Sequence, residues 1–346
     1  MADFLDILLS RYTFLSTKEK LLLRDICGDE DDLKRLDTAD IEWIIGRRLR
    51  KTRWSVKKAL SEAENTAHRL AADGIKCLFF QESGYPPQLA EIWDPPYLLY
   101  LRGRLPDWNK PAVAVVGTRL ATGRGTDAAF GLGLGFGERG LPIVSGLALG
   151  IDSAAHMGNM AASAGTVAVL GSGVDRIYPA SNRKLALRIL ENGGALMSEY
   201  PPSSEVRKFN FPQRNRIISG LSRAVIVVEA PGKSGALITA DFALGQGRDL
   251  YFHSAATSSP GNTERVEKLL FSGAPLIDEA EEVLRDWGWA GCRDIDVLPG
   301  SCPEQLQEAG EMLADEMRNE LSGYRIKFNG NYFRRTYNES SYSVDS

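Results

Sequence analysis

Two arginines and an asparagine stand together in the sequence FPQRNRIISG at residues 211–220. Arg214 and Arg216 flank Asn215 at the expected start of a helix. Guanidinium groups beside the free N–H groups of a helix N-terminus form an anion site, and phosphate is a natural occupant. The segment therefore predicts phosphate binding, with either a free nucleotide or a nucleic-acid backbone as the source of the phosphate.

A second candidate phosphate site is the Gly/Ser turn in the sequence PGKSGALITA. Its GKS triplet resembles the end of a P-loop, but that motif needs a glycine five positions before Gly232, where this chain has Val227. What remains is a turn whose N–H groups from Ser234 onward could hold a phosphate at the start of a helix. Ser234 could equally be an ordinary helix cap, and the two roles are compatible.

A third turn, Gly117-Thr118-Arg119, ends an apolar segment and projects Arg119 from the ligand end of the expected sheet. A dinucleotide fingerprint would require GxGxxG here, whereas the next glycines are Gly123 and Gly125. We therefore expect no nucleotide cofactor. The later run GLGLGFG lies a full helix further on, and we interpret its glycines as a sign of close helix–sheet packing.

Further basic and aromatic residues extend this predicted site. The sequence IYPASNRKL places Asn182, Arg183 and Lys184 at another helix start, where they could add phosphate contacts or form a solvated helix end. Phe209 and Phe211 precede the Arg–Asn–Arg cluster. A single-stranded nucleic acid needs this combination, because its bases stack on rings while its phosphates meet cations. Each phenylalanine could instead anchor its loop in the core.

Candidates for catalysis are few. Asp152 and His156 stand four residues apart on an expected helix and so share a face. They could form an acid–base pair, although a structural hydrogen bond between such residues is more frequent. Three histidines without a cluster of ligands do not indicate a metal centre. We therefore expect no catalytic residue and no metal.

The charge distribution favours an anionic partner. The 346-residue chain has a net charge of -4, yet residues 101–230 hold 15 Lys and Arg against 9 Asp and Glu. A basic middle in an acidic chain suits a localised anion-binding face, although ordinary charge scatter could also produce it. The four cysteines lie far apart, and we find no apolar run of about 20 residues and no basic leader. These features predict a cytoplasmic protein with reduced thiols and no membrane segment.

Strand–helix alternation from residue 111 onward must position these residues. The apolar strands are expected at 112–117, 142–146, 166–171, 195–199, 224–230 and 249–253, with helices between them. Strands that are apolar along their whole length are buried on both faces, which predicts a mostly parallel sheet between two helical layers. This is an α/β, extended Rossmann-like, doubly wound fold, and its ligands bind at the carboxyl ends of the strands.

Three regions are expected along the chain. Residues 1–75 have helical spacing and predict a small helical domain, and residues 76–290 form the sheet domain. Residues 291–346 combine an acidic helix candidate at 302–321 with a polar tail. A frayed end is the default for this tail, and a hairpin around FNGNYF is the alternative.

Several sequence blocks in order resemble the DNA-processing protein A family (DprA, also called Smf). Among them are VAVVGTR, IVSGLALGIDSAAH, LGSGVDRIYPASN, FPQRNRIISGLS and VVEAPGKSGALITADFALGQGR, and the resemblance runs from about Tyr85 to Leu284. It implies a cytoplasmic bacterial protein without enzymatic activity that binds single-stranded DNA and forms a dimer through the Rossmann-like domain. It also implies that the protein protects incoming DNA and loads RecA during natural transformation, and that residues 1–75 are similar to a sterile-alpha-motif domain.

The predicted DNA groove combines the motifs above with the positions that the resemblance implies. It comprises Arg119, Ser145, Gly146, Asn182, Arg183, Lys184, Phe211, Arg214, Asn215, Arg216, Ser234, Gly235 and Thr239. The cations would meet phosphates, while Ser145, Gly146 and the SGALIT turn would supply backbone or hydroxyl contacts. The chain departs from the family pattern after GRDLYF, where it reads HSAATSSPGNTERVEKLLFSGA, and its tail shows no clear winged helix.

Two other classes of function compete with DNA binding. Rossmann-like nucleotide hydrolases of the lysine-decarboxylase-like group use a PGGxGT turn followed by a glutamate, whereas this chain has PGKSGALITA with Asp241 and no matching glutamate. A pure scaffold in DNA uptake would leave the arginines without a role. The sequence therefore favours a non-enzymatic, sequence-independent protein that binds single-stranded DNA.

Overall fold

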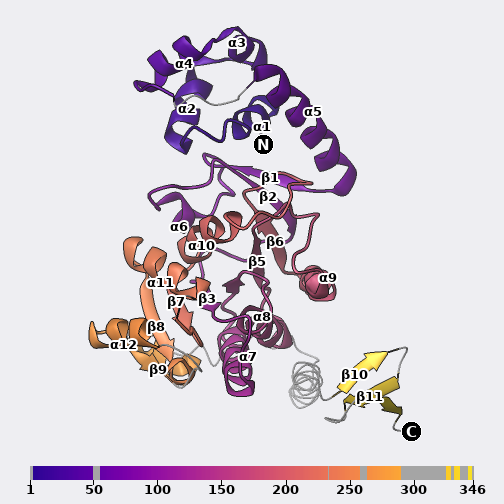
Figure 1. Ribbon diagram of the computed structural model, residues 1–346, viewed down its shortest axis with the longest axis vertical. Coiled ribbons are helices and arrows are strands. Elements are labelled where there is room, and N and C mark those ends of the chain that lie inside the picture. The colour runs from indigo at the N-terminus through magenta and orange to yellow at the C-terminus, as the bar shows by residue number, and fades with distance from the viewer. Residues whose placement is uncertain are drawn as a thin grey trace, which may run out of the picture.

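A nine-stranded sheet runs through the centre of this protein in the computed structural model (Figure 1). The structure describes residues 3–49, 55–232, 234–257, 263–289, 325–328, 331–335 and 342–344. The strands are β1 (Lys76–Phe79), β2 (Leu98–Gly103), β3 (Val113–Val116), β4 (Ile143–Ser145), β5 (Val167–Leu170), β6 (Ala195–Ser198), β7 (Ala224–Val227), β8 (Asp249–His253) and β9 (Leu276–Ile277).

The order of the strands confirms the doubly wound α/β fold. They are arranged β1-β2-β6-β5-β4-β3-β7-β8-β9. The strands from β6 to β9 are parallel, whereas β2 and β1 extend one edge in the antiparallel direction. The chain proceeds outward from β3 to β6, returns to the centre and continues outward from β7 to β9. The carboxyl ends of β3 and β7 therefore form the topological switch point.

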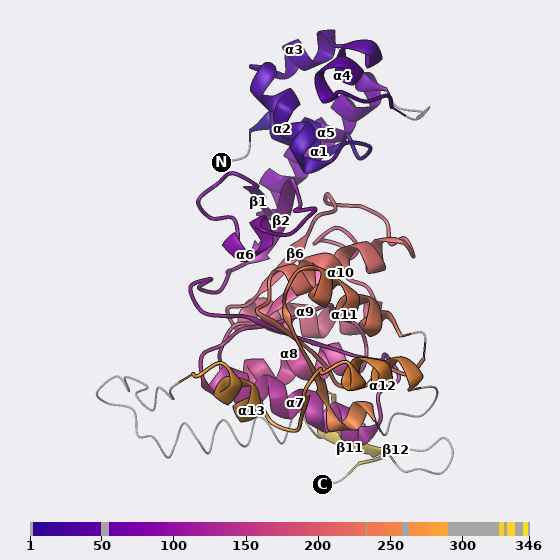
Figure 2. The same ribbon diagram turned by 90° about the vertical axis from the view of Figure 1, so that its left-hand side faces the viewer.

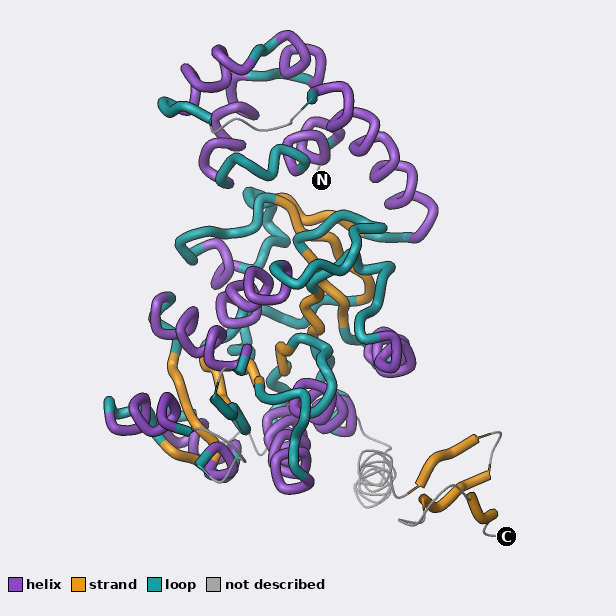
Figure 3. The backbone as a smooth tube through the Cα atoms, viewed as in Figure 1, coloured by secondary structure: helices purple, strands orange, loops and turns teal. Residues whose placement is uncertain are grey.

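Helices cover both faces of the sheet (Figures 2 and 3). One core packs under α7 (Gly123–Glu138), α8 (Ile151–Ala161), α9 (Arg183–Glu191) and α13 (Ala280–Asp286). The other packs under α6 (Pro87–Ala90), α10 (Asn210–Gly220), α11 (Gly235–Gly245) and α12 (Glu264–Phe271). Alternate residues of β3 serve the two cores, Val113 and Val115 the first and Ala114 and Val116 the second. This period of two is the pattern of a strand buried on both faces.

The glycines of the GLGLGFG run have a different role from the one that the sequence predicted. A Cβ on Gly133 would collide with the carbonyl oxygen of Ala155 in α8, and a Cβ on Gly158 of α8 would collide with that of Phe130 in α7. Gly133 of the run and Gly158 of α8 therefore allow the backbones of the two helices to approach each other. The expectation of close helix–sheet packing was wrong because the contact joins helix to helix.

The N-terminal helices form a separate layer above the antiparallel edge of the sheet (Figure 1). They are α1 (Phe4–Ser10), α2 (Thr17–Ile26), α3 (Glu30–Arg35), α4 (Thr38–Ile45) and α5 (Val56–Asp73). Leu8, Leu9 and Tyr12 share a third core with Tyr97 and Tyr100 of the β2 segment. The helices are therefore packed onto the sheet through buried apolar side chains.

Buried polar contacts fix this junction. The carboxylate of Asp6 accepts hydrogen bonds from Arg24 Nε at 2.5 Å and from the hydroxyl of Tyr97 at 2.9 Å. The hydroxyl of Thr17 donates to the carbonyl of Pro95 at 2.6 Å. Lys20 is also buried here, and burial lowers the pKa of its amine to about 8. Directional bonds of this kind set one orientation of the helices on the sheet, which apolar contact alone would not do.

The described part of the C-terminal region is a small antiparallel sheet. It consists of β10 (Arg325–Phe328), β11 (Asn331–Arg335) and β12 (Tyr342–Val344). The pairing of β10 with β11 confirms the hairpin alternative for the FNGNYF segment. The helix predicted at 302–321 lies outside the described residues. Within the described residues, no helix is both long and apolar enough to span a bilayer.

His156 makes a testable contribution to stability. It is fully buried in α8, and its Nδ1 lies 2.7 Å from the hydroxyl oxygen of Thr166, which itself donates to the carbonyl of Ile143. The ring must therefore donate from Nδ1, while its buried Nε2 has no hydrogen-bond partner that would favour a second proton. Burial, with a smaller effect of the charge on Arg214, lowers the pKa of His156 to about 3.

We predict that His156 makes the protein less stable as pH falls from about 6.5 toward 3, because the unfolded chain takes up a proton that the native ring refuses. The contribution to the slope is at most about 1.4 kcal/mol per pH unit for one proton. Urea unfolding at several pH values should show a smaller slope in His156→Gln than in the parent chain. Equal slopes would contradict a neutral buried ring.

Candidate functional site

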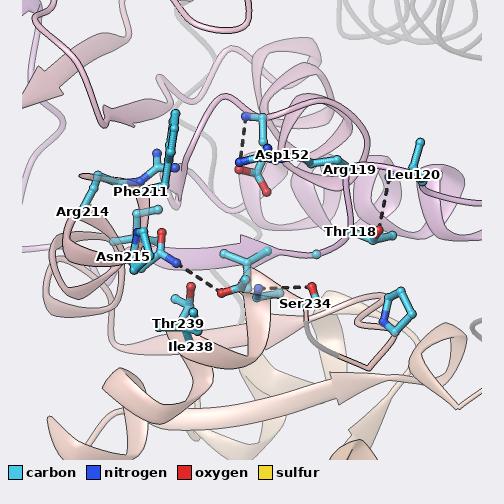
Figure 4. Close-up of a pocket in the computed structure, with 18 of the residues that line it drawn as sticks. Thr118, Arg119, Leu120, Asp152, Phe211, Arg214, Asn215, Ser234, Ile238 and Thr239 are labelled. Carbon is cyan, nitrogen blue, oxygen red and sulfur yellow. Dashed lines mark hydrogen bonds between the residues drawn. The ribbon is translucent and has the colours of Figure 1, made fainter. Parts of the chain in front are cut away.

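A cavity of about 730 Å³ opens at the switch point of the sheet (Figure 4). The loops after β3 and β7 and side chains from α10 and α11 form most of its wall, and Ala148, Asp152, Tyr178 and Lys208 complete it. Of the predicted groove residues, it brings together Arg119, Phe211, Arg214, Asn215, Ser234, Gly235 and Thr239. Residues from three separate sequence motifs therefore meet in one place, as the switch-point rule predicts.

Glu229 fixes the loop that carries Arg119. Its backbone carbonyl accepts from the N–H of Thr118 at 2.7 Å, and its buried carboxylate accepts from both the N–H and the hydroxyl of Thr122. Thr122 in turn caps α7, because its hydroxyl oxygen accepts from the N–H of Gly125 at 3.0 Å. The loop is held from the neighbouring strand, while Arg119 itself remains exposed. Sequence analysis missed this role of Glu229, although its place directly after a strand was a usable signal.

Two aromatic rings and a guanidinium group form a platform beside the cavity. The ring centroids of Tyr178 and Phe211 are 5.5 Å apart, and the guanidinium carbon of Arg119 lies 5.4 Å from the Phe211 centroid. Tyr178 is 45% exposed, so part of its ring is accessible to a ligand. The sequence prediction included Phe211 but not Tyr178, which lies in the same IYPASN segment as Asn182. Phe209 does not line the cavity and is exposed.

Arg214 lies at the bottom of the site. It is only 5% exposed, and its Nη1 donates to the carbonyl of Val169 at the end of β5. Its guanidinium lies flat against Gly146, where an added Cβ would collide with it. Burial lowers the pKa of Arg214 to about 10, and the charge of Asp152 only partly offsets this effect. The group remains a cation at neutral pH.

Asp152 organises the loop between β4 and α8. Its Oδ2 accepts from the N–H groups of Gly146 at 3.1 Å and Ala148 at 3.3 Å, on either side of Leu147. Leu147 has a φ of 57°, in the left-handed region that a leucine rarely adopts. Burial raises the pKa of Asp152, against the opposing effect of Arg214. The carboxylate and His156 have different hydrogen-bond partners, so the acid–base pair considered from sequence is not formed.

The start of α11 supplies the opposite wall. Ser234 is the N-cap, and its hydroxyl oxygen accepts from the N–H of Ala236 at 3.2 Å. Asn215 donates from Nδ2 to the carbonyl of Gly235 at 3.2 Å, which ties α10 to this turn. Thr239 is buried but still contributes to the cavity wall. Ser234 has the capping role that was one of its two compatible interpretations.

Two predicted contact residues support the site from below and do not reach its surface. The hydroxyl of Ser145 is buried and donates to the carbonyl of Val115 at 2.7 Å. Asn182 is also buried, and its Nδ2 donates to the carbonyl of Leu147 and to the hydroxyl of Ser153, both at 2.9 Å. Both side chains already have their partners inside the protein. We therefore assign them to the support of the β4 loop rather than to ligand contact.

Arg216 points away from the cavity. Its Nη1 and Nη2 donate to the two carboxylate oxygens of Glu199 at 2.9 and 2.7 Å, and its Nε donates to Asp94 at 3.2 Å. Burial alone would lower the pKa of Arg216, but the two carboxylates raise it. The sequence placed this arginine beside Arg214 as a phosphate contact. The structure gives it a structural role because residues two apart on a helix lie on nearly opposite faces.

Of three other cations in these segments, one lines the cavity and two do not. Arg183 and Lys184 are exposed at the start of α9, but neither lines the cavity. Lys208 does line it, from the loop that precedes α10. Sequence analysis missed Lys208, although it stands directly before Phe209 in the same basic and aromatic segment.

A family model and curated relatives match this chain. The model of the family described as DNA recombination-mediator protein A matches residues 76–288. The DNA processing protein DprA of Streptococcus pneumoniae is 41% identical over 203 residues, which are 59% of this chain and 71% of that protein. The protein Smf of Escherichia coli is 42% identical over 202 residues, which are 58% of this chain. The match therefore spans about half of the length of that protein, 54%.

Two solved structures are similar to this chain. The X-ray structure of DprA from Streptococcus pneumoniae has a TM-score of 0.65 at 33% identity and covers 82% of this chain and 98% of that one. A structure described as showing the single-stranded DNA binding mode of DNA processing protein A from Helicobacter pylori has a TM-score of 0.53 at 26% identity. It covers 62% of this chain and 95% of that one.

Arg216 and Arg119, which have different surroundings, give predictions of different size for the loss of stability. Arg216→Ala should lower the free energy of unfolding by about 2–3 kcal/mol, because it leaves the carboxylates of Glu199 and Asp94 without their cation at a partly buried site. Arg119→Ala should cost less than about 1 kcal/mol, because its side chain is exposed. Urea unfolding of both variants measures this difference. A larger loss for Arg119→Ala would contradict the assignment.

Proposed function

The chain belongs to the DNA recombination-mediator protein A family, and on that premise we propose that it binds single-stranded DNA without sequence preference. The observation that carries the proposal is the cavity at the switch point, where Arg119, Arg214 and the ring of Phe211 meet. Cations next to an accessible aromatic ring provide for the phosphates and the bases of a single strand. The solved Helicobacter pylori relative, described by its single-stranded DNA binding mode, supports the same ligand.

A single strand of DNA suits this site better than a mononucleotide cofactor. The turns after β3 and β7 carry neither a dinucleotide fingerprint nor a P-loop. Exposed cations continue beyond the cavity, with Lys208 at its edge and Arg183 and Lys184 at the start of α9. A polyanion can use all of these cations, whereas a single nucleotide reaches only those in the cavity. The affinity should therefore depend steeply on salt concentration.

We further propose that binding is the whole activity of the site and that the protein is not an enzyme. In the cavity, the carboxylate of Asp152 is engaged by two backbone N–H groups. His156 is buried away from solvent. The nucleotide-hydrolase alternative predicts that the protein releases ribose phosphate from nucleoside monophosphates. A colorimetric assay for that product separates the two proposals.

The role in the cell is proposed from the family. We propose that the protein acts in the cytoplasm, protects incoming single-stranded DNA and delivers it to the RecA recombinase during natural transformation. We also propose a homodimer formed through the Rossmann-like domain. Phe271 of α12, which is 96% exposed, and the half-exposed Leu276 on the edge strand β9 support a contact at this edge, since burial of large apolar side chains stabilises association.

The DNA proposal predicts two separable effects. Arg119→Ala should weaken binding of oligo-dT and reduce the slope of log affinity against log salt by about 0.7, the value for one lost phosphate contact on a single strand. Phe211→Leu should weaken binding by about 1–3 kcal/mol through lost stacking, with an unchanged salt slope. Fluorescence anisotropy at two salt concentrations, with a duplex of equal length as comparison, measures both effects.

Arg139→Ala is the matched control for charge, because Arg139 follows the opposite end of α7 and pairs with Glu281. Its affinity and salt slope should equal those of the parent chain. Unchanged binding of Arg119→Ala at both salt concentrations would remove the cavity from the DNA path. Equal affinity for duplex and single strand would contradict the stacking role of the rings.

A further inference from the structure

Arg214 is a buried cation without a carboxylate partner. Among the described residues, no Asp or Glu oxygen lies within 4.0 Å of its guanidinium, and its Nε has no hydrogen-bond partner. Arg216, two residues further on, shows how this protein neutralises a buried arginine, with two carboxylates at hydrogen-bond distance. A buried charge without compensation is costly. Because Asp152 offsets the charge of Arg214 only in part and from beyond 4.0 Å, the guanidinium is left able to take an anionic ligand as a further counter-ion.

A small second cavity lies next to this guanidinium. Its volume is about 70 Å³, compared with about 730 Å³ for the main cavity. Arg119 and Arg214 contribute the charged walls, Tyr178 and Phe211 the aromatic ones, and the β4 loop with Pro179 the remainder. Arg119, Arg214, Tyr178 and Phe211 also line the main cavity, so the small one is a recess of it.

The nearby carboxylate of Asp152 offsets only part of the charge of Arg214. The Oδ2 of Asp152 accepts from Gly146 and Ala148, which keeps the carboxylate on the β4 loop. The guanidinium of Arg214 packs against Gly146, and a Cβ at residue 146 would collide with this guanidinium. The loop therefore holds Asp152 and Arg214 at fixed places without joining them in an ion pair. The recess therefore has a net positive charge, because two guanidinium groups, those of Arg119 and Arg214, outnumber the one nearby carboxylate of Asp152.

We propose that this recess binds the terminal phosphate of a DNA strand, between the guanidinium groups of Arg119 and Arg214. This rests on the proposed function and specifies what the inner part of that site recognises. A recess of about 70 Å³ has room for one phosphoryl group but not for a nucleoside. A terminal phosphomonoester carries a charge near −2 at neutral pH, more than the single charge of an internal phosphodiester. Two guanidinium groups therefore favour the end of a strand.

The test compares short oligo-dT strands that differ only at their ends. One carries a 5′-phosphate, one a 3′-phosphate, and one has hydroxyl groups at both ends. We expect one of the two phosphorylated strands to bind about tenfold more tightly than the hydroxyl-ended strand, as charge-assisted hydrogen bonds to one additional anion would provide. Competition against one labelled hydroxyl-ended strand gives all three affinities on a single scale.

Three variants locate the effect. Arg214→Gln removes the buried charge and should abolish the preference for the phosphorylated end. Gly146→Ala keeps every charge but places a methyl group against the guanidinium of Arg214, and it should reduce the same preference. Arg183→Ala, which removes an exposed cation outside the recess, should weaken binding of all three strands by the same factor and so preserve the preference. Thermal unfolding of each variant establishes that it is folded.

The outcomes separate this inference from the proposed function. Equal affinity for all three strands in a parent chain that binds DNA would overturn the recess as an end-binding site and leave the DNA groove in place. A preference that persists unchanged in a folded Arg214→Gln variant would also overturn it, because the end would then be bound elsewhere. Failure of the parent chain to bind any of the three strands would instead contradict the proposed function.

Discussion

The reversal of strand order between β3 and β7 is the constraint on which the rest of the structure depends. These two parallel strands are followed by helices on opposite faces of the sheet, α7 after β3 and α11 after β7, so neither helix closes over both carboxyl ends. The opening is held by Glu229, which follows β7 and binds the loop after β3 through its carbonyl and its carboxylate. The loop that carries the exposed Arg119 is therefore held in position by a residue of the other half of the sheet, Glu229.

The electrostatics of the site follow from the position of α10. This helix runs between the cavity and the N-terminal layer, and it carries Arg214 on one side and Arg216 on the other. Arg216 is neutralised by Glu199 and Asp94, and the buried Lys20 of α2 interacts electrostatically with both carboxylates. The charge of Arg214 is only partly offset by Asp152, and the side chain lines the cavity. One helix thus joins the N-terminal layer to the wall of the cavity.

Much of this arrangement could be predicted from the sequence. Continuous apolar strands predicted the parallel sheet, and motifs at their carboxyl ends predicted Arg119, Phe211, Arg214 and Ser234 at one site, because parallel strand ends share an edge. Local spacing could not show that Arg216 turns toward Glu199. That contact depends on which face of α10 is covered by segments distant in sequence. The same limit applies to Tyr178, which stacks on a ring that is 33 residues later in the chain.

The glycine run shows the same limit. Its residues indicated close packing, but the identity of the partner, helix α8, is a property of the assembled layers. Ser145 and Asn182 were predicted as contacts because they lie in the right loops, and their side chains are nevertheless used to hold those loops. Polar residues near a ligand edge divide into those that touch the ligand and those that shape its site. Only tertiary structure separates the two groups.

The central claim is that single-stranded DNA runs through the cavity at the switch point with its bases against the aromatic platform. Photochemical cross-linking of a bromodeoxyuridine oligonucleotide, followed by mass spectrometry of the linked peptides, tests this contact most directly. The account predicts covalent attachment at Tyr178 or Phe211, which Phe211→Leu should shift toward Tyr178. Attachment confined to peptides outside the cavity, such as those of residues 3–49, would contradict it.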